Sequence, residues 1–204
     1  MLHCAPRSSK HGWRAIATIA SCSLSLYGAV PEGWHLLGSK PGSYEVGVDL
    51  QTVYNGRPSA YLRYISLNEP SSGGSGLLMQ QFGAIRYRGQ RVRFSAYVKA
   101  DAVENWAGLL MRVDRGIGIL DRIVSFDNMG NRPIKGTTEW QFYEVVLDVP
   151  ENSDLIALGI LILGKGRVWL NSASLEIVSK AVPLTGAPAR PLPDGPVNLS
   201  FDQQ

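Results

Sequence analysis

The richest concentration of polar side chains lies between Asp127 and Glu139, and it also includes Asn128, Arg132 and Lys135. A carboxylate and a guanidinium at this spacing can hold a polar ligand through charge-assisted hydrogen bonds. Loops on a rigid scaffold are where binding groups usually sit. A structural interpretation stays open, in which Asp127 and Asn128 cap a turn and Arg132 pairs with Asp127 to stiffen a long connection.

A second candidate for ligand contact is Trp106, which follows two polar residues and precedes a small-residue pair. Exposed aromatic rings bind sugars because the apolar face of a pyranose matches a flat π surface. We therefore predict a ligand-binding site formed by Trp106 and the segment 127–139. Trp140 and Trp169 stand in apolar stretches, which favours a place in the core.

Residue types for catalysis and metal binding are sparse. The chain has three histidines and two cysteines, and none of them has the spacing of metal ligands. His35 is flanked by apolar residues, which is typical of an ordinary strand position. Four carboxylates could supply acid–base chemistry only if folding paired them: Asp101, Glu104, Asp114 and Asp121. The sequence thus leans against an enzyme and predicts no catalytic residue and no metal site.

The charge balance argues against nucleic acid as the direct partner. The net charge is +3, with 20 Lys and Arg against 17 Asp and Glu, which is too small to imply DNA binding by itself. The alternating arginines between Arg86 and Arg93 suit either an anion patch or a solvated face paired with carboxylates. No apolar run approaches the ~18 residues of a membrane-spanning helix.

Strands must position these side chains, because apolar and polar residues alternate through much of residues 31–178. The stretch Arg91–Val98 is typical, with every second residue apolar, and Asn55-Gly56 is a strong turn signal. About nine strands with frequent turn signals predict an all-β fold, an antiparallel two-sheet β-sandwich of the jelly-roll type. Separate strands are expected at Arg91–Val98 and Ala107–Val113, with a long polar connection at Asp127–Glu139.

The two ends of the chain differ from this domain in composition. Residues 1–30 hold both cysteines, several basic residues and an apolar, small-residue run, the outline of a secretion signal or of a lipid anchor at Cys22. The favoured alternative is a leader running into a first strand, so the sequence slightly favours a cytoplasmic protein over an exported or lipid-anchored one. Residues 179–204 are rich in proline and predict an extended tail. Val197–Asp202 alternates as a short edge strand could, and a disordered tail is the alternative left open.

Several segments resemble a known family. Gly33-Trp34, Ser43–Asp49 and Asn55–Ala60 resemble the opening of galactose-binding-like jelly rolls of the carbohydrate-binding-module type. Tyr87–Lys99 is similar to their central strand. More narrowly, Phe126–Trp140 is similar to a bacterial jelly-roll group whose members are often labelled AraC-type transcriptional regulators by automated naming.

The resemblance implies a non-catalytic module that binds a carbohydrate or another small polar molecule. Some members hold a structural calcium through a carboxylate of the last strand, where this chain has Asn171. No cofactor is therefore expected, although calcium stays open. A helix-turn-helix needs two amphipathic helices within about 20 residues, and the sequence has none, so any DNA-reading part would lie on another chain.

Two other functions remain open, and each predicts a different site. A small jelly-roll enzyme of the cyclase or isomerase type, acting on a hydrophobic metabolite, needs a deep pocket with a carboxylate. A stand-alone sensor domain of a transcription system needs a self-complementary surface, and a homodimer is left open. A binding module needs an exposed aromatic ring on a shallow face.

Overall fold

The structure is a computed structural model, and it describes residues 27–66, 74–116, 122–186, 195–196 and 199–200. These residues form ten β-strands and one short 3-10 helix. In chain order the elements are β1 (Tyr27–Gly28), β2 (His35–Leu37), η1 (Pro41–Ser43), β3 (Tyr44–Tyr54), β4 (Arg57–Tyr64), β5 (Ser75–Gly83), β6 (Arg91–Arg115), β7 (Arg122–Asp127), β8 (Ile134–Asp148), β9 (Leu155–Leu163) and β10 (Arg167–Val178).

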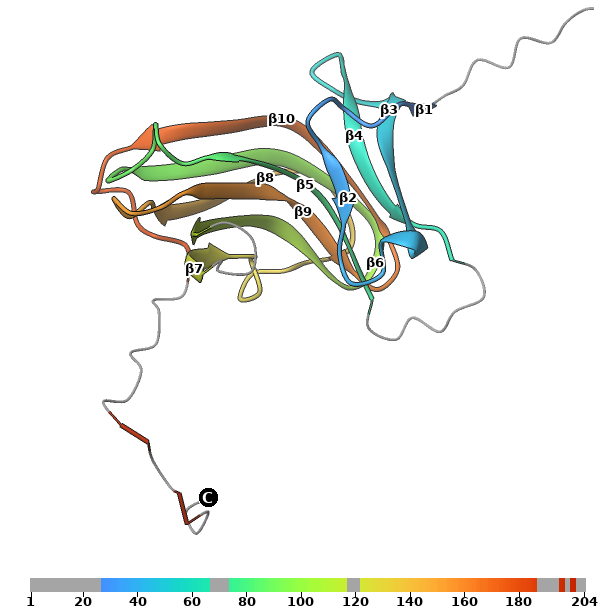
Figure 1. Cartoon of the computed structure of the whole chain (residues 1–204). Helices are drawn as coiled ribbons and strands as arrows, with labels where there is room; N and C mark the ends of the chain where they lie inside the picture. Colours follow the sequence, from blue (N-terminus) through green and yellow to red (C-terminus); the bar gives the residue numbers. More distant parts are fainter. Residues whose placement is uncertain (1–26, 67–73, 117–121, 187–194, 197–198, 201–204) are drawn as a thin grey trace, which may run out of the picture.

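All strand pairs are antiparallel, and β6 belongs to both layers of the fold (Figure 1). The first half of β6 pairs with β10 and β8, and its second half pairs with β9 and β7. We call β1-β3-β4-β10-β6-β8 the β10 layer and β2-β5-β9-β6-β7 the β9 layer. The all-β antiparallel sandwich predicted from the sequence is therefore confirmed.

The bend between the layers lies in the middle of β6, where the inward-facing positions change parity. In the first half the fully buried residues have even numbers, from Val92 to Ala100, and in the second half they have odd numbers, from Ala107 to Val113. Register shifts in the pairing with β8 and a φ of +50° at Ala102 mark the bulges that exchange the two faces. The core forms between the layers from both halves of β6.

Two element boundaries expected from the sequence are wrong, and both lie at or beside the irregular middle of β6. The expected strands Arg91–Val98 and Ala107–Val113 are one strand, because bulges change the alternation without a turn. The expected polar connection Asp127–Glu139 is mostly strand, since β8 begins at Ile134 and only residues 128–133 form the loop. The start of β8 is polar because it lies beside the irregular middle of β6.

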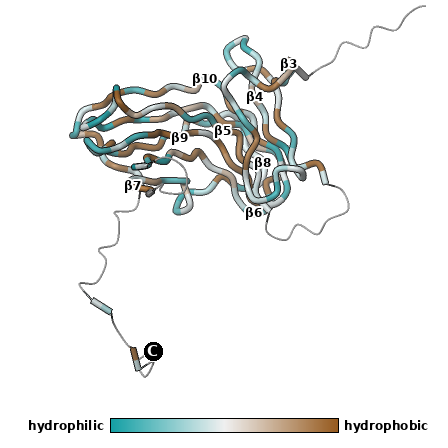
Figure 2. Tube along the Cα trace, in the orientation of Figure 1, coloured by the Kyte–Doolittle hydropathy of each residue, from teal (hydrophilic) through white to brown (hydrophobic). Residues whose placement is uncertain are grey.

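The hydrophobic segments follow the strands of both layers (Figure 2). The clearest case is β9, whose residues Ile156–Ile162 are all buried. Both edges of β9 are paired, to β5 and to β6, so it is the central strand of its layer.

Most residues of the two terminal segments lie outside the part of the chain that the structure describes. The expected leader is described only from Tyr27, where β1 pairs with β3. Within the expected tail strand, only Leu199 and Ser200 are described, and they form a turn. The first part of the tail lies against the domain, because the Thr185 hydroxyl accepts a hydrogen bond from the backbone N–H of Val146 at 2.7 Å.

Candidate ligand-binding site

The structure separates the six residues predicted to bind ligand into three places. These are a half-buried position on β6 for Trp106, the end of β7 and the following loop for Asp127, Asn128 and Arg132, and the exposed surface of β8 for Lys135 and Glu139. Within the second group, Asp127 and Arg132 are joined by a direct contact, whereas the side chain of Asn128 accepts a hydrogen bond from the backbone N–H of Gly130.

Asp127 and Arg132 form a bidentate ion pair that fastens the start of the tail to the domain. Arg132 donates to the two carboxylate oxygens at 2.6 and 3.2 Å, and the Thr185 hydroxyl donates to Oδ2 at 2.7 Å. Arg132 also donates to the backbone oxygen of Glu144 at 3.0 Å. Asp127 is 6% exposed. We call this the tail clamp; it matches the structural interpretation left open above, while a ligand role for these residues stays a prediction.

The tail clamp gives stability a predictable pH dependence. Burial opposes ionisation of Asp127, but hydrogen bonds from Arg132 and Thr185 outweigh it and lower the pKa of this carboxyl. A pKa lowered by folding stabilises the fold above the unfolded value of about 3.9, and this contribution is lost as pH falls through the folded pKa. We expect the urea midpoint to fall between about pH 5 and about pH 2, and to fall less in Asp127→Asn. An identical fall in both proteins would contradict this assignment.

Four aromatic rings are in contact on the outer surface of the β10 layer, and we call them the aromatic patch: Tyr54, Tyr97, Trp140 and Phe142. Tyr54 stacks on Tyr97 with ring centroids 4.3 Å apart. Phe142 meets Tyr97 edge-on at 5.5 Å, and Trp140 lies 5.2 Å from Tyr54. Phe142 is 51% exposed and Trp140 is half-buried. The expectation of a core position is thus wrong for Trp140, whereas Trp169 is buried as expected.

Strand register and one hairpin assemble the aromatic patch. Tyr97 and Phe142 are direct partners across β6 and β8. Tyr54 arrives from the β3–β4 hairpin, whose Asn55-Gly56 turn has positive φ at both residues, the conformation that this dipeptide favours. Asp49 holds a bulge in β3 by accepting hydrogen bonds from two backbone N–H groups, and this bulge shifts the register before Tyr54.

Charged groups flank the aromatic patch along the strands. Two residues beyond Tyr97 on β6, Lys99 pairs with Glu139 at 2.8 Å. In the other direction Arg93 pairs with Glu176 at 2.8 Å, and it lies 3.6 Å from Glu144. Polar side chains that can bond hydroxyl groups therefore border the four aromatic rings. Of the six predicted residues, Glu139 is the one that reaches this border.

Three of the four alternating arginines, Arg88, Arg91 and Arg93, are paired with carboxylates rather than gathered into an anion patch. Arg91 pairs with Asp148 at 2.9 Å and Arg88 with Asp154 at 3.0 Å. The hydrogen bond with Arg91 lowers the pKa of Asp148. These contacts agree with a solvated, ion-paired face.

Metal sites and membrane-spanning helices can be assessed only for the residues that the structure describes. No group of three or more His, Cys, Asp and Glu side chains in those ranges could hold a metal ion. Asn171, the residue in question for calcium, donates to the backbone oxygens of Arg57 and Pro58 at 3.0 Å. Nor do those ranges contain a helix with the length and hydrophobicity needed to cross a membrane.

No protein-family model matches the chain. A Bacillus subtilis protein named uncharacterized HTH-type transcriptional regulator YbfP is 43% identical over 175 residues, which are 85% of this chain and 57% of that protein. The chain thus spans little more than half the length of this relative. The relative's name agrees with the regulator label of the group that Phe126–Trp140 resembles.

Three solved structures are similar to this chain to different degrees. The enzymatically active domain of a bacteriophage CBA120 tailspike protein has a TM-score of 0.50 and 15% identity, over 72% of this chain and 20% of that chain. The CBM22-1 xylan-binding domain from Paenibacillus barcinonensis has a TM-score of 0.49 and 20% identity, over 77% and 93%. TmCBM61 in complex with β-1,4-galactotriose has a TM-score of 0.45 and 14% identity, over 74% and 92%. These neighbours include carbohydrate-binding modules, and the likeness concerns the fold alone.

Proposed function

We propose that this domain is a non-catalytic binding module for a carbohydrate, and that the aromatic patch is its binding surface. The observation that carries the proposal is the exposed ring of Phe142, which lies edge-on to Tyr97 on the outer face of the β10 layer, in a cluster that also includes Tyr54 and Trp140. An exposed aromatic ring on such a face is what the sequence analysis required of a binding module.

The chemistry of the patch suits a pyranose. Each sugar ring has an apolar face of C–H groups, which packs on a flat π surface, and hydroxyl groups around its rim. At the patch the rim would meet the amino group of Lys99 and the carboxylates of Glu139 and Glu144, which are partly exposed and can rearrange. Because the aromatic patch lies on the outer surface of the β10 layer, we expect weak, reversible binding.

Calorimetric titration of the full chain with a panel of oligosaccharides tests this proposal. We expect one of them to bind, and Phe142→Ala to weaken its binding about fivefold, since an aromatic contact contributes about 1 kcal/mol. Trp106→Ala is the matched control, because it removes a half-buried aromatic ring outside the patch.

Two results would count against the proposal. One is the absence of binding by any sugar in the panel. The other is a sugar whose binding is lost in Trp106→Ala but kept in Phe142→Ala, which would place the site at the residue favoured by the sequence.

A second candidate function is favoured by the name of the Bacillus subtilis relative, a transcriptional regulator of the helix-turn-helix type. In this alternative the domain senses its ligand and reports to a DNA-binding segment. The described elements include no α-helix, so they provide no helix-turn-helix. Occupancy would then be communicated through contacts between the described domain and a DNA-binding segment outside the described residues.

Sedimentation velocity of the chain, with and without a bound sugar, separates the two functions. A sensor is expected to change its monomer–dimer distribution on binding, because ligand and association are thermodynamically linked. A simple module is expected to keep the same distribution.

A further inference from the structure

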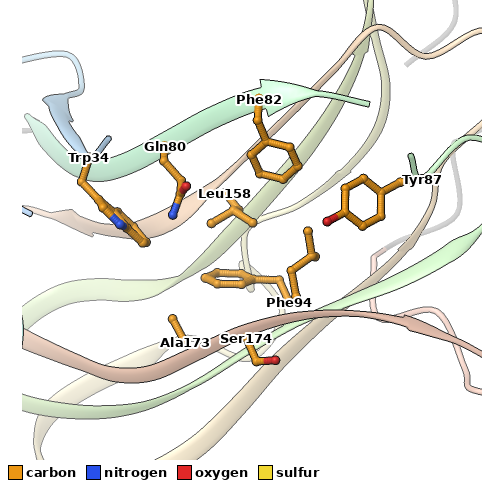
Figure 3. Close-up of a pocket in the computed structure, with 9 residues that line it drawn as sticks. Trp34, Gln80, Phe82, Tyr87, Phe94, Leu158, Ala173 and Ser174 are labelled. Carbon is orange, nitrogen blue, oxygen red and sulfur yellow. The ribbon is translucent and has the colours of Figure 1, made fainter. Parts of the chain in front are cut away.

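A cavity of about 300 Å³ lies at the side of the sandwich, between the β9 and β10 layers (Figure 3). Four of its nine lining residues are aromatic, and we call it the side pocket. Its lining includes Trp34, Gln80, Phe82, Tyr87, Phe94 and Ser174. It is separate from the aromatic patch, which lies on the outer surface of the β10 layer.

The side pocket exists because two strands lose their neighbours at the same side of the fold. β4 pairs with β10 only over Arg167–Leu170, and β2 pairs with β5 only over Leu77–Met79. Beyond these points, Ala173–Leu175 of β10 and Gln80–Phe82 of β5 are sheet edges. The space between these two edges therefore opens to the side of the fold, with the buried side chain of Phe94 beneath it.

The side chains converge on this opening. Figure 3 shows Gln80 and Phe82 extending from β5 toward Ala173 and Ser174 of β10, with Trp34 at one end and Tyr87 at the other. The Tyr87 ring lies edge-on to Phe82, with centroids 5.9 Å apart. The floor is formed by Phe94 and Leu158.

The polar groups of the side pocket are few and uncharged. They are the Gln80 amide, the Tyr87 hydroxyl and the Ser174 hydroxyl. Within the part of the chain that the structure describes, neither the Gln80 amide nor the Tyr87 hydroxyl bonds another side chain, whereas Ser174 donates to Glu176 at 3.2 Å. The pocket lining includes no carboxylate, so it does not have the acid–base groups that the enzyme alternative requires.

We propose that the side pocket binds a small, uncharged molecule with one fused aromatic ring system and one polar substituent. A cavity of about 150 Å³ holds a benzene ring, so about 300 Å³ has room for roughly a dozen non-hydrogen atoms. The flat rings of Trp34, Phe82 and Phe94 favour an aromatic ligand through stacked and edge-on contacts. The Gln80 amide and the Tyr87 hydroxyl bind its polar substituent.

The probe for the test is 2-naphthol, titrated into the full chain by calorimetry. We expect saturable binding to the wild type. Ala173→Phe places an aromatic ring in the pocket from an exposed strand edge, and we expect it to abolish binding. Gln80→Leu removes the amide and is expected to weaken binding about tenfold.

The matched control is Gln81→Leu, the same substitution one residue further along β5. Gln81 is exposed and points to the opposite face of the strand, so its replacement is expected to leave 2-naphthol binding unchanged. The anion 2-naphthoate is expected to bind at least tenfold more weakly than 2-naphthol, because desolvating a charge without a partner is costly.

Failure to bind 2-naphthol in the wild type would overturn the proposal, as would unchanged binding in Ala173→Phe. If that variant does not fold, equal affinities of Gln80→Leu and Gln81→Leu would overturn it instead. The proposal is independent of the carbohydrate site, since Phe142→Ala is expected to reduce sugar binding and to leave 2-naphthol binding intact.

Discussion

Replacing Arg132 by methionine is expected to lower the free energy of unfolding by about 3–5 kcal/mol. The substitution keeps most of the side chain's length but leaves the carboxylate of Asp127, which is 6% exposed, without its cation. Thermal unfolding measures the effect. For a chain of this size 1 kcal/mol corresponds to roughly 2–4 °C, so the melting temperature should fall by about 10 °C.

The matched control is Lys99→Met, which removes the cation of an exposed pair. The carboxylate side chain of Glu139 is 81% exposed, and water can solvate it once Lys99 is gone. The expected loss is below about 1 kcal/mol. If both variants lose the same stability, the tail clamp is no stronger than a surface ion pair.

The Arg132→Met effect should also depend on pH in a particular direction. Without Arg132, the largest remaining influence on Asp127 is burial, which raises the pKa of its carboxyl. The variant therefore takes up the proton at a higher pH than the wild type does. The stability difference between the two proteins should be largest near neutrality and should shrink as the solution is acidified.

The layer structure was predictable from the sequence because alternation is a local property. The stretch Arg91–Val98 shows its inward and outward faces directly, and the structure places them as expected. The continuity of β6 was not predictable, because a bulge changes the parity of the alternation just as a turn between two strands does. The polar start of β8 was missed for the related reason that an irregularly paired edge tolerates polar residues.

The aromatic patch was harder to predict than the tail clamp. Asp127 and Arg132 are five residues apart, so their pairing could be proposed from sequence as a structural alternative. Tyr54 and Tyr97 are far apart in the chain, and only the β3–β4 hairpin brings them into contact. In the stretch Trp140–Val149 apolar residues occupy both faces, so the sequence could not show which face Trp140 would take.

The side pocket forms where the pairing of β2 with β5 and of β4 with β10 stops. The alternation of apolar and polar residues in the sequence does not show where strand pairing stops. Gln80 lies on the same face of β5 as the buried Leu78, between Met79 and the exposed Gln81, so the sequence shows it as an ordinary strand position. Its access to the core depends on β2 beginning only at His35, opposite Met79, and on β4 pairing with β10 only as far as Ala60, opposite Leu170. Strand ends are the least regular part of a sheet, so this opening could be found only in the structure.

Replacing Gly159 by alanine is expected to lower the free energy of unfolding by about 3 kcal/mol or more, although it adds a single methyl group. A Cβ atom at this position would lie 2.8 Å from the Cα of Met79 and still closer to the carbonyl oxygen of Leu78. Both atoms belong to the backbone of β5, so no side-chain rotation can relieve the contact. Chemical denaturation with urea measures the loss as a lower midpoint.

Gly83→Ala is the matched control, because Gly83 also lies in the β5–β9 pairing but has nothing within 4 Å of its added Cβ. Its effect should stay within about 0.5 kcal/mol. Equal effects of the two substitutions would mean that the tight approach of β5 and β9 does not exist.

A loss confined to Gly159→Ala shows that these strands must stay in contact, and the same contact keeps Gln80 of β5 beside Leu158 of β9 in the side pocket. The folded fraction of the Gly159→Ala variant should therefore bind 2-naphthol more weakly than the wild type does. The Gly83→Ala variant should bind 2-naphthol as tightly as the wild type.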